Sequence, residues 1–248
     1  MELREIVHRY AEGLSYIDAH TTHISSNGKT GATYLPGLLS LGEPVAMREL
    51  DQWWGHAHPD DFGNASDHAV QVRYPQSTIT CDQILTTVGA KFTPEWCIEA
   101  KRLQLIGDNG GQNDFGTGKA LSPYLKDRSL MHDIDKLRAH PFGDRLAVIA
   151  YGFNYTPSTL QNARQLHPEH SSRLDKIQDV VLKNGGTLAL KPVADFANDL
   201  FRVQRLTATD YEYEIFNAWR HPCGGQGVVF GWEILKHGVL GHTPSWSE

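Results

Sequence analysis

The sequence has few cysteines, no long apolar run and no excess of positive charge. Its three cysteines, Cys81, Cys97 and Cys223, form no CxxC pair, which excludes a disulfide framework or a zinc ribbon and favours a reducing compartment. No apolar stretch approaches the roughly 18 residues that a membrane span needs. The first residues, MELREIVHRYAEG, lack the basic and apolar segments of a signal peptide. We therefore expect a cytoplasmic protein without a membrane partner.

The composition is that of an ordinary globular chain, with 40% hydrophobic and 21% charged residues among 248. The length permits one large domain or two small ones, but neither a strong linker nor an internal repeat divides the sequence. We expect a single domain over residues 1–248. The formal net charge of -6 speaks against a generally basic nucleic-acid-binding surface, although it leaves room for a local basic groove.

Two helices are predicted in the first part of the chain. Apolar residues recur at helical spacing from the start, at Leu3, Ile6, Val7, Tyr10, Leu14 and Ile17. A second, shorter helix is predicted over GEPVAMRELDQWWGHA, residues 42–57, and ends near Pro59. Residues 1–66 therefore form an N-terminal helical part.

Strand signals dominate the remainder, over residues 67–235. Short β-like segments are predicted at 69–74, 78–88, 95–103, 144–153, 187–192 and 227–235. Helices are predicted at 128–140 and 171–186, and the glycine-rich stretch 107–118 is predicted to be a loop. Strand 144–153, helix 171–186 and strand 187–192 have the spacing of a βαβ unit. This predicts an α/β fold in which part of the sheet is parallel and helices cover its faces.

The segment WCIEAKR carries two charges in an otherwise apolar strand. Because strand side chains alternate, Glu99 and Lys101 lie on one face, opposite apolar neighbours. Upstream, TITCDQILTTV contains one acid, Asp82, and the turn GAKFTP joins the two segments. In an antiparallel hairpin centred on this turn, opposite residues have numbers that sum to about 181 or 182. Asp82 is then predicted to face Glu99 to within one residue.

Two carboxylates in a partly buried place repel each other, and a divalent cation removes that cost. Mg²⁺ is commonly held by one or two carboxylates together with water and phosphate oxygens. Lys101, on the same face as Glu99, would orient or activate the attacking water and stabilise charge on a phosphate. The pattern favours metal-assisted hydrolysis of a phosphodiester bond.

An acid on one strand followed by E-x-K on the next resembles the PD-(D/E)XK, restriction-endonuclease-like nuclease superfamily, with Asp82, Glu99 and Lys101 as the matching residues. The wider text EWCIEAKRLQLIGDNG, LSPYLKDRSLMHDIDKLR, AVIAYGF and GWEI is similar to a bacterial subgroup with this signature, so the resemblance covers roughly residues 70 to 235. The residue before Asp82 is Cys81, where the family motif has Pro.

The resemblance implies a restriction-endonuclease-like core with a mixed central sheet flanked by helices. It implies an endonuclease, acting on DNA with RNA not excluded, that has a restriction or defence role. Mg²⁺ would be held by Asp82 and Glu99, with Mn²⁺ as a substitute. A further acid from the preceding helix sometimes joins the metal site in this superfamily, and Glu49 in MRELDQWW is the residue predicted for that place.

Basic residues offer contacts to a nucleic-acid backbone. The candidates are Lys126, Arg128, Lys136 and Arg138 near helix 128–140, and Arg220 and His221 in WRHPCGGQG. Lys136 and Arg138 fit the solvated face of an amphipathic helix equally well, and Arg220 and His221 fit structural packing. One active site per chain acting on two strands favours a symmetric homodimer.

Two other functions compete with the nuclease. A catalytically inactive nucleic-acid-binding or protein-interaction module would keep the same fold without using the acids. A transition-metal hydrolase would use the H-x-H pair His56 and His58 with Asp60 or Asp61, but no third ligand is placed by spacing, so a polar loop is the better interpretation of GHAHPDD.

Overall fold

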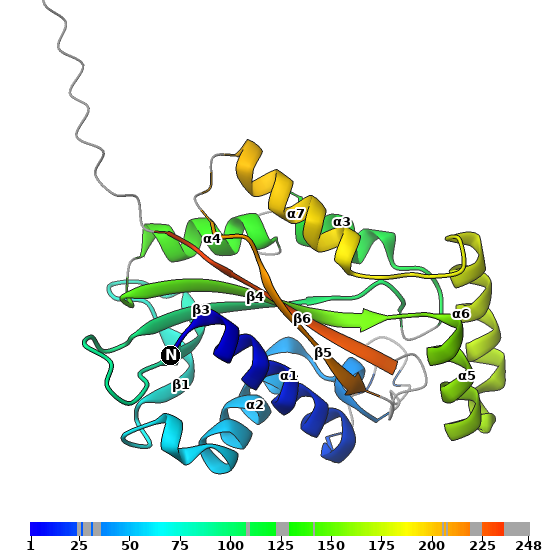
Figure 1. Ribbon diagram of the computed structural model, residues 1–248, viewed down its shortest axis with the longest axis horizontal. Helices are drawn as coiled ribbons and strands as arrows, with labels where there is room; N and C mark the ends of the chain where they lie inside the picture. The colour runs from blue at the N-terminus through cyan, green and yellow to red at the C-terminus, as the bar shows by residue number, and fades with distance from the viewer. Residues whose placement is uncertain are drawn as a thin grey trace, which may run out of the picture.

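The computed structural model describes residues 1–23, 26, 31, 36–107, 110–122, 129–140, 142–204, 206, 208–218 and 225–235; for residues 39 and 114–117 it describes the backbone alone. A six-stranded sheet with the order β1-β2-β3-β4-β6-β5 forms its centre. Only the β3–β4 pairing is parallel, so the sheet is mixed (Figure 1). The strands are β1 His68–Arg73, β2 Thr80–Leu85, β3 Trp96–Leu103, β4 Arg145–Asn154, β5 Glu212–Ala218 and β6 Gly225–Glu233.

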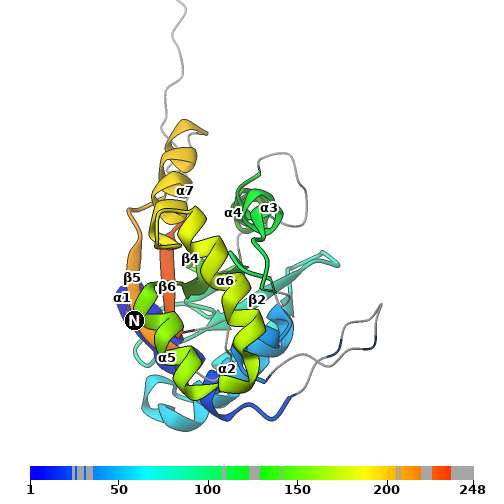
Figure 2. The same ribbon diagram turned by 90° about the vertical axis from the view of Figure 1, so that its right-hand side faces the viewer.

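Helices flank this sheet, as the sequence predicts for an α/β protein. The helices are α1 Leu3–His20, α2 Glu43–Ala57, α3 Asp114–Leu121, α4 Leu130–Ala139, α5 Pro157–Leu166, α6 Ser171–Lys183 and α7 Lys191–Val203. Helices α1 and α2 lie on one side of the sheet, and α3, α4 and α7 lie on the other (Figures 1 and 2). Helices α5 and α6 pack together at one end. Among the described helices, none is long and apolar enough to cross a membrane.

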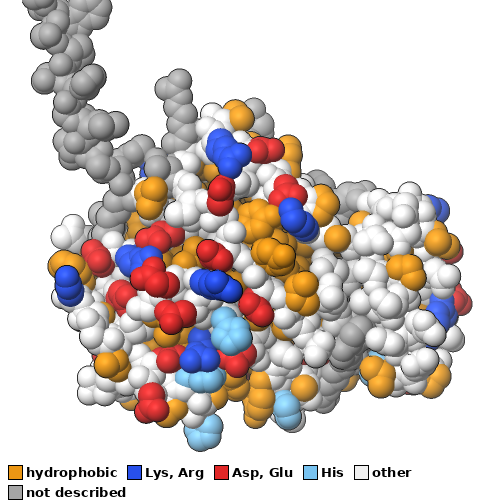
Figure 3. Space-filling model, in the orientation of Figure 1, with side chains coloured by type: hydrophobic (Ala, Val, Ile, Leu, Met, Phe, Trp, Pro, Cys, Tyr) orange, Lys and Arg blue, Asp and Glu red, His pale blue; other side chains and the backbone are white. Residues whose placement is uncertain are grey.

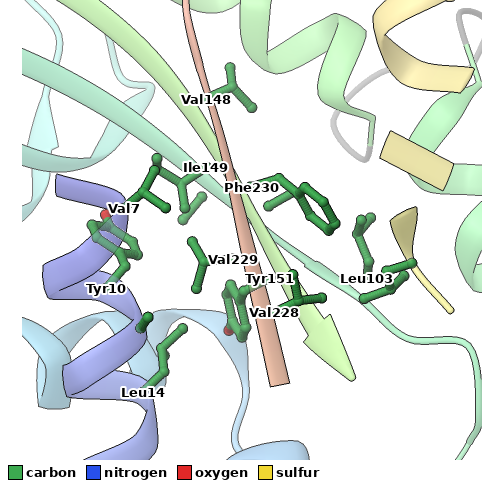
Figure 4. Packing of buried hydrophobic residues seen from close by; sticks show 14 of the residues in the cluster. Val7, Tyr10, Leu14, Leu103, Val148, Ile149, Tyr151, Val228, Val229 and Phe230 are labelled. Atoms are coloured by element: carbon green, nitrogen blue, oxygen red, sulfur yellow. The ribbon is translucent and has the colours of Figure 1, made fainter. Parts of the chain in front are cut away.

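Helix α1 packs against β5 and β6 through a buried apolar face. Val7 and Tyr10 of α1 lie beside Ile149 and Val229 of the central strands (Figure 4), and all four side chains are buried. The apolar i, i+3, i+4 spacing of α1 places these residues on one face, and their burial provides the main drive for docking the helix. Residues 146–153 of β4 are buried on both faces, which agrees with the apolar run that the sequence shows there.

Two predicted elements differ in the structure. The strand predicted at 187–192 is wrong: Leu188 makes an isolated bridge to Tyr155, and α7 begins at Lys191. Pro192 in the first helical turn is compatible with that start, because the missing N–H of a proline has no helical partner there. The parallel partner of β4 is therefore β3, and the connection between them runs through α3 and α4.

The loop predicted over 107–118 is also wrong in its second half, because α3 begins at Asp114. Two glycines in this helix lower its intrinsic propensity, and contacts with β3 and α4 compensate for them. Helix α5 and strand β5 have no counterpart among the predicted elements. The other predicted helices and strands are present, with shifted ends.

The hairpin register that the sequence predicts is confirmed. Strands β2 and β3 pair as Gln83 with Ile98, Ile84 with Cys97 and Leu85 with Trp96, so the partners sum to 181. The pairing stops at Gln83, whereas β3 continues to Leu103 along its parallel partner β4. Among the residues that the structure describes, no strand pairs with this edge of β3 over its second half, and the candidate site lies there.

Candidate active site

Glu99 and Lys101 share one face of β3. They stand next to Val148 and Ala150 of β4, and their charged ends contact side chains of α4. Trp96 projects to the other face, where its indole N–H donates to the carbonyl of Met1. The alternation read from WCIEAKR is therefore present in the structure.

Two carboxylates take the place of the strand neighbour that β3 lacks. The N–H of Ala100 donates to Asp82 Oδ2 at 2.9 Å, and the N–H of Arg102 donates to Glu43 Oε2 at 2.8 Å. These N–H groups are two residues apart and point to the same side of the strand. The Gln71 amide donates to the second oxygen of Asp82 at 3.0 Å. Backbone geometry thereby fixes both acids at the opening between β2 and β3.

Glu99 lies fully buried below this opening. The Tyr74 hydroxyl donates to its Oε1 at 2.5 Å, and the Lys136 ammonium contacts its Oε2. Burial raises the pKa of Glu99 to about 10, and Asp82 adds to the rise while Lys136 opposes it. Without a further positive charge, this carboxyl holds a proton at neutral pH.

Lys101 has a different pair of acidic neighbours. Its Nζ lies 3.1 Å from Asp133 Oδ2 and 3.6 Å from Glu43 Oε1. Burial lowers the pKa of Lys101, but Glu43 and Asp133 outweigh it and the net shift is upward. The group therefore stays an ammonium: it can orient a water molecule or stabilise negative charge, but it does not accept a proton near neutral pH.

Helix α4 supplies two of the ionic groups. Ser129 caps the helix by accepting the N–H of His132 at 3.2 Å, which fixes the first turn. Asp133 and Lys136 follow three residues apart, so they project from one side of the helix with 3.8 Å between Nζ and Oδ1. Burial raises the pKa of Asp133, with Lys101 and Lys136 opposing the rise.

These groups surround a hollow of about 340 Å³. Its lining consists of Glu43, Thr78, Ile79, Thr80, Asp82, Lys101, His132, Asp133 and Lys136. The size suits a small ligand or part of a larger one. Glu99 is not part of the lining, because Tyr74 and Lys136 enclose it.

Glu49 does not belong to this group, and the acid that α2 contributes is Glu43. Glu49 accepts a hydrogen bond from the Thr21 hydroxyl at 3.1 Å and lines a separate hollow beside Trp53 and His56. Six residues along a helix correspond to a rotation of about 600°, so Glu43 and Glu49 point in different directions. The structure therefore does not bring Glu49 to the hollow beside Asp82; the acid of α2 that lines this hollow is Glu43.

The predicted nucleic-acid contacts are only partly described. Lys126, Arg128, Arg220 and His221 lie outside the described residues. Lys136 is not on a solvated helix face, because its side chain is 13% exposed and contacts Glu99. Arg138, on the same helix, is half-buried.

The histidine pair of the alternative metal site is divided between two surroundings. His56 lines the hollow beside Glu49, whereas His58 lies 3.4 Å from Glu12 and packs edge-on against Trp53. In the part of the chain that the structure describes, no three His, Cys, Asp or Glu side chains form a preformed metal cage.

The charges of the β2–β3 opening nevertheless suit one divalent cation. Four acids and two lysines gather there: Glu43, Asp82, Glu99, Asp133, Lys101 and Lys136. With all of them ionised, four negative and two positive charges leave a net charge of -2. Burial raises the pKa of Glu43, Glu99 and Asp133, and the neighbouring lysines oppose the rise without cancelling it. A hydrated Mg²⁺ needs only one or two carboxylates, so the residues fit it without an all-protein cage.

Sequence reasoning missed Glu43, Tyr74 and Asp133. Glu43 begins a helix before Pro44, where an acid is ordinarily explained by the helix dipole. Asp133 carried a usable signal, because it lies three residues after Leu130 and four before Leu137, on the apolar side of α4. A buried acid on the apolar side of a helix needs a partner. Nothing in the sequence marks Tyr74.

Comparisons with protein-family models, with curated protein sequences and with solved structures found no match.

Proposed function

We propose that this protein is a metal-dependent endonuclease that hydrolyses phosphodiester bonds, acts on DNA and has a restriction-endonuclease-like core. One observation carries the proposal: Asp82 and Glu43 are fixed on alternate N–H groups of β3, beside the Lys101 ammonium. A purely structural ion-pair network has no need for an excess of acids around an open hollow.

Asp82 and Glu43 would hold Mg²⁺ or Mn²⁺, with Glu99 as a further ligand. When bound, the cation would polarise a phosphate oxygen and lower the pKa of a bound water. Lys101 stays positively charged between Asp133 and Glu43, so it stabilises charge on the phosphate and orients the attacking water. Asp133 keeps the Lys101 ammonium at the hollow, 3.1 Å away.

The distribution of charge on the protein suits a short-range contact with nucleic acid at the hollow better than long-range attraction. On the face seen in Figure 3, the described Lys and Arg side chains lie among Asp and Glu and form no continuous basic patch. The net charge is -6. Long-range attraction to DNA is therefore weak, and a bound cation and the lysines of the hollow carry the phosphate contact. A homodimer, with one site for each strand, belongs to the same proposal.

A cleavage assay tests the proposal directly. Plasmid, linear and single-stranded DNA and RNA are incubated with Mg²⁺, Mn²⁺ or EDTA. We expect metal-dependent cutting by the wild type and a loss of at least about 100-fold in Asp82→Asn and Lys101→Ala, the order of magnitude for removing a charge-stabilising group. Glu49→Gln is the matched control, because it changes an acid of α2 outside the site and should keep full activity.

The inactive binding module gives a different result. It predicts no cutting of any substrate, and DNA binding that is unchanged by EDTA and by Asp82→Asn. Full activity of Asp82→Asn would contradict the assignment of the site even if the protein cuts DNA.

A further inference from the structure

The contact between Lys136 and Glu99 raises a question about how the site would accept a metal. We infer that the Lys136 ammonium is an exchangeable partner of Glu99: it contacts Glu99 when no metal is bound, and it leaves Glu99 when that side chain becomes a metal ligand. The inference rests on the proposed function and adds to it a positioning residue from α4.

The geometry makes the two cations mutually exclusive at Glu99. Both oxygens of this carboxyl group are engaged, Oε1 by the Tyr74 hydroxyl and Oε2 by the Lys136 ammonium. Glu99 is fully buried and has no exposed edge for a further ligand. Two positive charges cannot both contact one oxygen without strong repulsion. Lys136 must therefore move before Glu99 can bind a cation.

The Lys136 ammonium can move towards the hollow and stay close to a second acid. Its side chain ends at the hollow, which it lines together with Asp82 and Lys101. Asp133 Oδ1, 3.8 Å from Nζ, is a second acidic neighbour on the same helix. Rotation of the flexible side chain away from Glu99 keeps the ammonium paired with Asp133 and turns it towards the space where a phosphate would lie.

The two lysines of the site differ in which acids they contact. Lys101 contacts Glu43 and Asp133 and makes no contact with Glu99 among the described ion pairs, so it does not block that carboxylate. Lys136 contacts Glu99 and blocks it. The difference predicts that Lys136, and not Lys101, competes with a cation for Glu99.

Calorimetric titration of the full-length protein with Mn²⁺ tests the inference. We expect Lys136→Gln to bind Mn²⁺ at least about tenfold more tightly than the wild type, because the competing charge is gone. Arg138→Gln removes the same charge from the same helix and should keep wild-type affinity. Lys136→Arg keeps the charge and should bind Mn²⁺ no more tightly than the wild type. Equal or weaker binding by Lys136→Gln, in a folded protein, would overturn the inference.

Thermal unfolding gives a second readout that does not depend on activity. In EDTA, Lys136→Gln should have a lower Tm than the wild type, because the buried Oε2 of Glu99 has lost its contact with the Lys136 ammonium. Saturating Mn²⁺ should raise its Tm by more than it raises that of the wild type. Equal Tm gains in the two proteins would contradict an exchange.

The measurements distinguish a failure of the Lys136 exchange from a failure of the metal site. If the wild type binds Mn²⁺ and cuts DNA but Lys136→Gln has unchanged affinity, only the exchange is wrong. If neither protein binds Mn²⁺, the metal site itself is wrong, and the exchange with it.

Discussion

At the scale of single residues, burial decides the protonation of the site. Glu43, Glu99 and Asp133 all have pKa values above those of ordinary carboxyl groups, with burial as the largest cause. Acids that are buried with too few cations around them bind protons, and a metal ion that displaces those protons binds more tightly as pH rises. At the proposed metal site, cation binding is therefore expected to release protons.

Glu99 should make the metal-free protein less stable as pH rises. Its pKa in the folded protein is about 10, above the ordinary 4.5, so between these values the folded state holds a proton that the unfolded state has lost. The free energy of unfolding consequently falls with rising pH across that window. Glu99→Gln should show a flatter pH dependence, which urea denaturation in EDTA between about pH 5 and pH 9 measures. An identical slope for wild type and variant would mean that folded Glu99 is already ionised.

The sequence predicted the placement of some residues of the site but not of others. Asp82, Glu99 and Lys101 could be read from strand alternation and hairpin register, which depend only on backbone geometry. Glu43 and Asp133 reach the site through tertiary packing of α2 and α4, and the position of a helix over a sheet is not encoded in a local pattern. The same reason explains the choice of Glu49 over Glu43.

At the scale of elements, α4 positions two ionic side chains of the site, Asp133 and Lys136. The buried Ser129 hydroxyl satisfies an N–H in the first turn, one turn before Lys136. We expect Ser129→Ala to lower the free energy of unfolding by about 1 kcal/mol, because α4 loses its N-terminal cap. The variant should also bind Mn²⁺ more weakly, because the helix that carries Asp133 and Lys136 is then less firmly held. Urea denaturation and calorimetry measure the two effects.

Thr156→Ala provides the comparison for that variant. Thr156 caps α5, at the far end of the sheet, and accepts the N–H of Thr159 at 3.2 Å. It should lower stability by a similar amount, about 1 kcal/mol, without changing metal affinity. Equal losses of Mn²⁺ affinity in both variants would show that general destabilisation, and not the anchoring of α4, is the cause.

Apolar periodicity alone did not decide which elements were predictable, because α5 and α7 have apolar faces as regular as that of α1 and were not predicted. Helices α1 and α6 and strand β4 have clear apolar patterns and appear where the sequence places them. Residues 187–192 have an apolar stretch typical of a strand, but the proline after Lys191 and the packing of α7 produce a helix start instead. Strand β5 at the sheet edge alternates exposed and buried residues over only part of its length, which leaves little signal.

At the scale of the whole molecule, close contact between α1 and the sheet ties the first residues to the last strand. Gly231 of β6 permits that contact, since a Cβ at this position would lie 2.6 Å from Val7 Cγ2 and 2.9 Å from Ile149 Cδ1. We expect Gly231→Ala to destabilise the protein by about 1–3 kcal/mol through overpacking. Chemical denaturation measures this change.

Gly118→Ala is the control for overpacking, because among the described residues nothing outside its own helix lies within 4 Å of the added Cβ. Gly118 is in α3, where alanine has the higher helix propensity, so this variant should be neutral or more stable by several tenths of a kcal/mol. A Gly231→Ala protein as stable as the wild type would mean that α1 can shift away from the sheet at little cost.

The early end of the β2–β3 pairing has a consequence for how the protein can change over time. Asp82 and Glu43 come from different elements, yet the N–H groups that hold them are two residues apart on one strand, about 6.6 Å by strand geometry. The backbone of β3 sets the spacing of the two N–H groups by covalent dimensions, whereas the packing of α2 and β2 must keep Glu43 and Asp82 within hydrogen-bond reach of them. Substitutions in the surrounding core that leave these two hydrogen bonds intact should therefore leave the spacing of the two carboxylates unchanged over evolutionary time.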